Sequence, residues 1–134
     1  MNDRGSVRGQ RVLVVDDDAD TCELYAIALG HEGHVVTAAF DGESALARMT
    51  SEPFDVALID LALVGLDGLA VARAARDALG ERTPYLVAIS GYGSPAHRSA
   101  CEDAGFDEHH LKRVPPDELL SMVGRAHRRP GHSE

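Results

Sequence analysis

Five short apolar runs that alternate with helical patterns constrain this chain more than any other feature of its sequence. Each run has four or five residues, and all but the last are rich in Val, Leu, Ile or Ala, which predicts strands. The predicted strands are Arg11–Val15, Val35–Ala39, Val56–Ile59, Leu86–Ile89 and Glu108–Leu111. Between them apolar residues recur at helical spacing, as at Leu24, Ile27 and Ala28, and a fifth helix is predicted at Asp117–Ala126.

Strand–helix alternation of this kind predicts a three-layer, doubly wound (βα)5 fold. Right-handed crossovers then give a five-stranded parallel sheet with helices on both faces, so the first, third and fourth strands are almost continuously apolar. With 134 residues the chain is long enough for one core. We expect one domain at 11–126 and flexible polar tails at 1–10 and 127–134.

Composition narrows the possible partners. Asp and Glu number 22 against 13 Lys and Arg, which disfavours direct nucleic-acid binding, because phosphate recognition needs clustered basic residues. No apolar run approaches the roughly 20 residues of a membrane span, and residues 1–6 lack the apolar core of a signal peptide. We therefore expect a cytoplasmic protein without membrane insertion, in which Cys22 and Cys101 are small buried residues. The seven His residues show no zinc-binding spacing.

Polar residues follow the predicted strands at their carboxyl ends, where open parallel sheets bind ligands. Asp16 and Asp17 follow the first strand and Asp60 the third, while Ser90 and Lys112 follow the fourth and fifth. Neighbouring carboxylates repel each other unless a cation lies among them, and oxygen ligands favour Mg²⁺, or Mn²⁺ in its place. Lys112 is the only lysine, and its ammonium could follow a carboxylate or a phosphoryl group.

Taken singly, each of these residues has an ordinary structural explanation. Asp18, in the same acidic run, would cap the first helix. Ser90 precedes Gly91 and could belong to a turn, and Lys112 could simply be solvated. Only their joint occurrence at one edge of a sheet favours a functional site.

Six segments make the chain resemble the response-regulator receiver (CheY-like) family over residues 10–126. They are RVLVVDDD at 11–18, GHEGHVV at 30–36, FDVALID at 54–60, LVGLDG at 63–68, AISGYG at 88–93 and AGFDEH at 104–109. The resemblance implies a flavodoxin-like strand order of 2-1-3-4-5. The last two segments look more like receivers attached to hybrid histidine kinases than like those of transcription factors.

The resemblance also implies roles for the strand-end residues. Asp60 would be the phospho-acceptor, and Asp17 and Asp60 would bind the metal directly, with Asp16 acting through water and Ala62 lending its backbone carbonyl. Ser90 and Lys112 would contact the phosphoryl oxygens. Ser90 and the ring at His109 would form a two-state switch.

A receiver of this kind would accept phosphate from a phosphohistidine on a sensor kinase or phosphotransfer protein, and would lose it slowly, without being a metabolic enzyme. Its output would act through a protein partner at residues 94–126, as a monomer or a phosphorylation-dependent dimer. Two alternatives remain open. One is a degenerate receiver that binds a protein without phosphorylation. The other is an aspartyl-phosphate phosphatase, which would need a second carboxylate where Ala62 stands.

Two positions, Arg113 and Val64, depart from the family pattern. Lys112 precedes Arg113 instead of a proline, and a non-proline cis bond costs about 2.5–4 kcal/mol, so we predict a trans bond there. Val64 stands in place of a proline, which predicts a more mobile loop. Tyr92 lies where a side chain could slow dephosphorylation.

Overall fold

A computed structural model describes residues 9–63, 65–91, 93 and 95–128 of the chain. The strands are β1 (Arg11–Val15), β2 (Val35–Ala39), β3 (Val56–Asp60), β4 (Tyr85–Ser90) and β5 (Glu108–Leu111). The α-helices are α1 (Ala19–Gly30), α2 (Gly42–Ser51), α3 (Gly68–Leu79), α4 (Pro95–Ala104) and α5 (Pro116–Arg128), with a 3-10 turn, η2, at Gly80–Arg82. The predicted strands are all confirmed, with β3 and β4 slightly longer than predicted. Helix α5 runs two residues past its predicted end.

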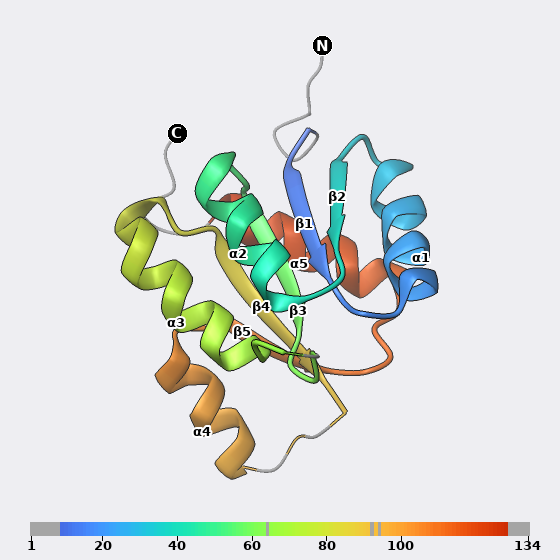
Figure 1. The fold of residues 1–134 in the computed structure, drawn as a ribbon. Coiled ribbons are helices and arrows are strands. Elements are labelled where there is room, and N and C mark those ends of the chain that lie inside the picture. Colours follow the sequence, from blue (N-terminus) through green and yellow to red (C-terminus); the bar gives the residue numbers. More distant parts are fainter. Residues whose placement is uncertain (1–8, 64, 92, 94, 129–134) are drawn as a thin grey trace.

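The strands form one parallel sheet in the order β2-β1-β3-β4-β5, which confirms the predicted fold class. Figure 1 shows α1 and α5 on one face of this sheet and α2, α3 and α4 on the other. The strand order reverses direction at β1 and β3. Their carboxyl ends therefore border the crevice in which open α/β sheets bind ligands.

Two apolar clusters, one on each face, explain why the central strands are almost continuously hydrophobic. In β1, Leu13 and Val15 belong to the cluster beneath α2, α3 and α4, whereas Val12 and Val14 belong to the cluster beneath α1 and α5. Alternate side chains of a strand point to opposite faces, so a strand covered on both sides needs apolar residues at every position. Cys22 and Cys101 are buried free thiols, as predicted.

Aspartates are the N-cap residues of three helices. Asp18 caps α1, Asp41 caps α2 and Asp67 caps α3, each accepting a hydrogen bond from a backbone N–H of the first turn. These bonds satisfy donors that have no partner inside the helix. The predicted capping role of Asp18 is confirmed, and it fixes the point at which the chain turns away from β1.

The loop after β3 packs closely against two glycines. A Cβ atom on Gly42 would lie 2.1 Å from the Leu66 carbonyl oxygen, and one on Gly68 would lie 2.8 Å from Leu61 Cα. No side chain larger than hydrogen fits at either position without movement of the backbone. These contacts hold the segment that follows Asp60 against the first residues of α2 and α3.

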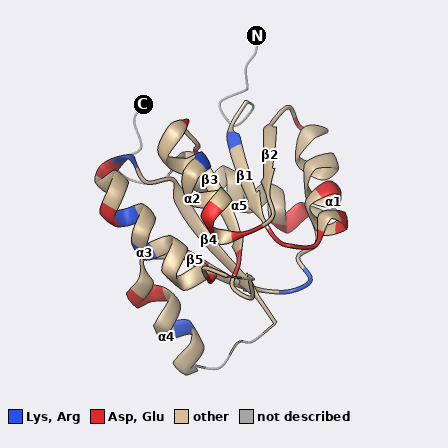
Figure 2. Cartoon of the chain, viewed as in Figure 1, with Lys and Arg blue, Asp and Glu red and all other residues tan. Residues whose placement is uncertain are grey.

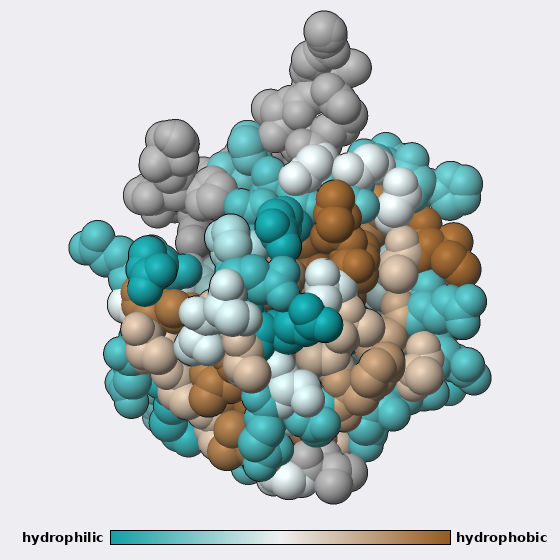
Figure 3. Space-filling view, turned by 45° about the horizontal axis from the view of Figure 1, so that its top comes forward, coloured by the Kyte–Doolittle hydropathy of each residue, from teal (hydrophilic) through white to brown (hydrophobic). Residues whose placement is uncertain are grey.

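The surface carries few large hydrophobic side chains in the described part of the chain. The most exposed are Leu24 and Ile27 of α1, Val35, Phe40 and Leu111. On the face seen in Figure 3, hydrophobic surface is divided into separate patches among hydrophilic residues. No helix among the described residues has the length and apolar character that a membrane crossing requires.

Candidate phospho-acceptor and cation site

Three carboxylates meet at the carboxyl edge of the sheet. Oxygen atoms of Asp16, Asp17 and Asp60 all lie within 4.8 Å of one another. Asp16 and Asp60 are each only 4% exposed, whereas Asp17 is open to solvent. Figure 2 shows acidic residues in the loop from β1 to α1 and basic residues in the loop from β5 to α5, at this same edge.

The register of the sheet produces this meeting. Val15 of β1 pairs with Ile59 of β3, so the residues that follow, Asp16 and Asp60, leave the two strands side by side. On the other side, Asp60 pairs with Ile89 of β4, which places Ser90 one position further along. The order of the strands and their matched ends therefore bring together residues that are 44 positions apart along the chain.

Backbone hydrogen bonds fix the two buried carboxylates. Asp18 N–H donates to Asp16 Oδ1 at 2.9 Å, and Ala62 N–H donates to Asp60 Oδ1 at 3.0 Å. Burial raises the pKa of Asp16, and the charge of Asp60 adds to this effect, although the hydrogen bond from Asp18 opposes it. A cation among the carboxylates would favour their charged forms. This set of oxygen donors fits a divalent ion such as Mg²⁺.

Lys112 supplies a positive charge at the same place. Its Nζ lies 3.0 Å from Asp60 Oδ2 and 3.5 Å from Asp16 Oδ2. Partial burial by itself would lower the pKa of Lys112, but the hydrogen bond to Asp60 and the two carboxylate charges raise it above its usual value. The ammonium is thus held protonated beside Asp60, the carboxylate to which the family resemblance assigns the acceptor role.

The peptide bond between Lys112 and Arg113 is cis, so the prediction of a trans bond is wrong. That prediction used the preference of a non-proline peptide bond considered alone. In the folded chain Lys112 is held at two points. Its backbone N–H donates to the Ser90 carbonyl at 2.8 Å, and its Nζ donates to Asp60 Oδ2. Tertiary contacts here decide a geometry that local sequence does not.

Ser90 and His109 lie in contact across β4 and β5. Ser90 Oγ is 3.0 Å from His109 Nε2, and Ser90 is 2% exposed while the His109 ring is half-buried. The family resemblance assigned both to a switch, without predicting that they touch. Val64 and Tyr92, to which the sequence assigned loop mobility and slow dephosphorylation, lie outside the described residues.

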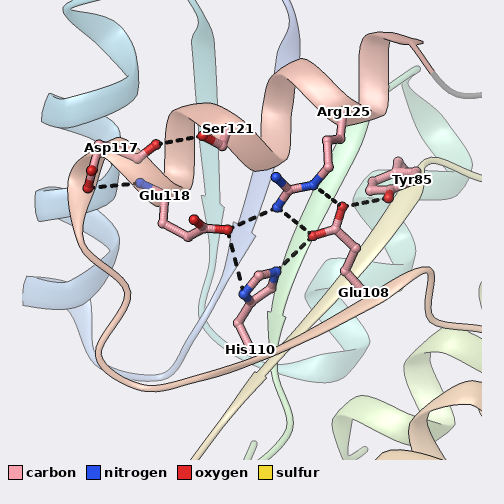
Figure 4. A network of polar contacts seen from close by, with 7 residues as sticks. All are labelled: Tyr85, Glu108, His110, Asp117, Glu118, Ser121 and Arg125. Atoms are coloured by element: carbon pink, nitrogen blue, oxygen red, sulfur yellow. Dashed lines mark hydrogen bonds and ion pairs between the residues drawn. The ribbon is translucent and has the colours of Figure 1, made fainter.

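Sequence reasoning missed a polar network that joins β5 to α5 (Figure 4). Glu108 accepts two hydrogen bonds from Arg125, at 2.7 and 2.8 Å, one from the Tyr85 hydroxyl at 2.6 Å, and contacts His110 Nε2 at 2.7 Å. Arg125 also donates to Glu118 at 3.0 Å. The available signal was the alternation of Glu108 and His110, which puts both on the face that α5 covers.

Residues 12–124 match the family described as response regulator receiver domain. Among curated relatives, the transcriptional regulatory protein TcrA of Mycobacterium tuberculosis is 36% identical over 126 residues, which are 93% of this chain and 49% of TcrA. The transcriptional regulatory protein ResD of Bacillus subtilis is 31% identical over 113 residues, covering 84% of this chain and 46% of ResD. The chain spans about half the length of these relatives.

Solved structures of receiver domains have the same fold as this chain. A CheY-like response regulator receiver domain protein from Methanospirillum hungatei superposes with a TM-score of 0.82 at 27% identity, covering 89% of this chain and 94% of that one. The receiver domain of the Francisella response regulator 1452 superposes with a TM-score of 0.83 at 26% identity, covering 90% and 98%.

Proposed function

Because the chain belongs to the response regulator receiver domain family of two-component systems, we propose that it accepts a phosphoryl group on Asp60 in a Mg²⁺-dependent reaction. The observation that carries this proposal is the pairing of Asp60 with Lys112 Nζ, at 3.0 Å, inside a cluster of three carboxylates. An isolated buried carboxylate would be a poor acceptor. A carboxylate that lies beside a bound metal ion and the Lys112 ammonium can accept the negative charge of a phosphoryl group.

In the proposed reaction, a carboxylate oxygen of Asp60 attacks the phosphorus of a phosphohistidine. An O–P bond forms, the P–N bond breaks, and the imidazole leaves with the electron pair and takes up a proton. Phosphoryl transfer has a loose transition state, so positioning and charge stabilisation supply most of the catalysis. Lys112 would follow the transferred oxygens, and Ala62 N–H holds the carboxylate in place.

The metal would be held by Asp17 and Asp60, by Asp16 through water, and by the Ala62 carbonyl. Mg²⁺ would neutralise charge on the phosphoryl oxygens during transfer. The raised pKa of Asp16, caused by burial and the nearby Asp60, supports this assignment, because a cation would offset the cost of keeping these carboxylates charged.

The donor would dock beside α1. A cavity of about 520 Å³ is lined by residues of α1 and of the β5–α5 loop, among them Leu24, Tyr25 and Lys112. Leu24 is 66% exposed, and Lys112 belongs both to this groove and to the acceptor site. A histidine-bearing helix seated here would present its phosphoryl group to Asp60.

The switch would use Ser90 and His109. Movement of Ser90 toward a phosphoryl group on Asp60 would alter its 3.0 Å contact with His109, and so the surface at 94–126. The net charge of the whole chain, −9, favours a protein over nucleic acid as its partner.

Incubation with acetyl phosphate and Mg²⁺ tests the proposal. Intact-mass measurement should show one added phosphate on wild type, none on Asp60→Ala, and none on wild type in EDTA. Equal mass gain in wild type and Asp60→Ala would contradict the assignment, and no gain in either would favour a phosphorylation-independent binding module. Leu24→Ser should keep acetyl phosphate labelling and slow transfer from a phosphohistidine protein, since only the latter needs docking.

A further inference from the structure

A second cluster of metal-binding side chains lies between α4 and β5, separate from the three carboxylates. It consists of His97 and Cys101 of α4 and His109 of β5, and one ligand atom of each lies within 4.8 Å of the others. The imidazole rings of His97 and His109 are 5.6 Å apart between centroids and meet edge to face at 62°. None of these contacts involves the acidic residues of the acceptor site.

The local structure explains how the three side chains converge. His97 and Cys101 are four residues apart in α4 and therefore lie on the same face of the helix. Along β5, Glu108 and His110 contact residues of α5, as Figure 4 shows, so the intervening His109 points to the opposite face, toward α4. The network on the α5 side thus fixes the direction of the His109 side chain.

The donor atoms are withdrawn from solvent. Cys101 is 1% exposed, and His97 Nε2 and His109 Nδ1 are both shielded from water. His109 Nε2 contacts Ser90 Oγ at 3.0 Å, so a metal would bind this ring through Nδ1, with the serine setting its tautomer. Packing alone explains a buried Cys101, which touches the same core as Ala104 and Phe106. The two imidazoles each bring a nitrogen within 4.8 Å of that thiol.

We propose that His97, Cys101 and His109 form a transition-metal site that takes Zn²⁺. Two imidazoles and one thiolate are typical zinc ligands, and a fourth position would be filled by water. Tetrahedral Zn²⁺ places its ligand atoms about 3.3–3.7 Å apart, so the present cluster needs to contract by only ~1 Å. A cavity of about 160 Å³ lies beside two of the three ligands, Cys101 and His109, and is bordered by the exposed Arg98 and Glu102.

Binding would displace the thiol proton of Cys101, since the thiolate is the ligand. It would also tie the His109 ring to α4. If the proposed function holds, the metal would then restrain the Ser90–His109 switch. Metal binding itself does not depend on phosphorylation of Asp60.

Cobalt titration tests the site directly. Tag-free, reduced, chelator-treated protein is titrated with Co²⁺ in excess Mg²⁺, which occupies the carboxylate site. Binding at the proposed site should give a thiolate-to-cobalt charge-transfer band with one equivalent, which one equivalent of Zn²⁺ should abolish. Binding to carboxylates alone gives no such band.

Variants locate the ligands. Cys101→Ser should remove the band, and His97→Gln, at a partly exposed position, should weaken Zn²⁺ binding at least 10-fold. Cys22→Ser and Asp60→Ala are matched controls that should bind as wild type does, and circular dichroism checks that each variant is folded. A wild-type protein without the band, or Cys101→Ser with the wild-type band, overturns the proposal. Failure of phosphorylation in wild type would leave the cobalt result unaffected.

Discussion

Replacement of Glu108 by Gln tests how strongly the network between β5 and α5 stabilises the fold. Burial by itself would raise the pKa of Glu108, but hydrogen bonds from Arg125, His110 and Tyr85 outweigh it and lower the pKa from 4.5 to about 2. The Glu108 side chain is 13% exposed, so solvent screens these contacts only in part. The charged form is therefore strongly favoured in the folded state.

The size of the effect follows from this difference in pKa. At 1.36 kcal/mol per pH unit, a change from 4.5 to about 2 corresponds to about 3 kcal/mol of folding stability. Because the folded-state pKa is the lower one, this contribution is complete above pH 4.5 and is lost as the pH falls toward 2. At pH 3 about 1 kcal/mol should remain.

Urea unfolding of wild type and Glu108→Gln at pH 7 and pH 3 measures this directly. The difference in free energy of unfolding should be about 3 kcal/mol at pH 7 and shrink by about 2 kcal/mol at pH 3. Glu23→Gln, which alters an exposed carboxylate of α1, should change stability by less than about 0.5 kcal/mol at either pH. A Glu108→Gln difference that stays constant across this range would refute the reasoning.

Two further substitutions test the acceptor site and its supporting loop. Lys112→Ala removes the ammonium beside Asp60, so without metal it should lower the free energy of unfolding by about 1–3 kcal/mol. It should also tighten Mg²⁺ binding several-fold, and urea unfolding with and without Mg²⁺ measures both effects. A loss of stability that saturating Mg²⁺ fails to reduce would contradict the charge argument. Gly42→Ala places a methyl group 2.1 Å from the Leu66 carbonyl and should cost about 1–3 kcal/mol in thermal unfolding, whereas Gly30→Ala, with nothing within 4 Å, should change stability by less than about 0.5 kcal/mol. Equal effects of the two alanines would show that the loop after β3 is less closely packed than described.

Local patterns were sufficient to predict the fold class and to nominate the polar residues at the strand ends. The alternation of apolar runs with helical spacing fixes five strands and five helices, and coverage on both faces accounts for the apolar character of β1, β3 and β4. Asp16, Asp60 and Lys112 could be nominated because carboxyl ends of parallel strands share one edge. These inferences need only the period of the sequence and the direction of the chain, whereas the strand order and the acceptor role of Asp60 were implied by the resemblance to the receiver family.

Contacts between elements that are distant in the sequence could not be predicted from these local patterns. The cis bond before Arg113, the contact between Ser90 and His109, and the Glu108 network each depend on the exact placement of neighbouring elements. The cluster of His97, Cys101 and His109 could not be predicted for the same reason. The sequence shows the four-residue spacing of His97 and Cys101 in a helix but not which strand faces that helix. Periodicity determines which face a side chain occupies, whereas only packing decides which side chain it meets there.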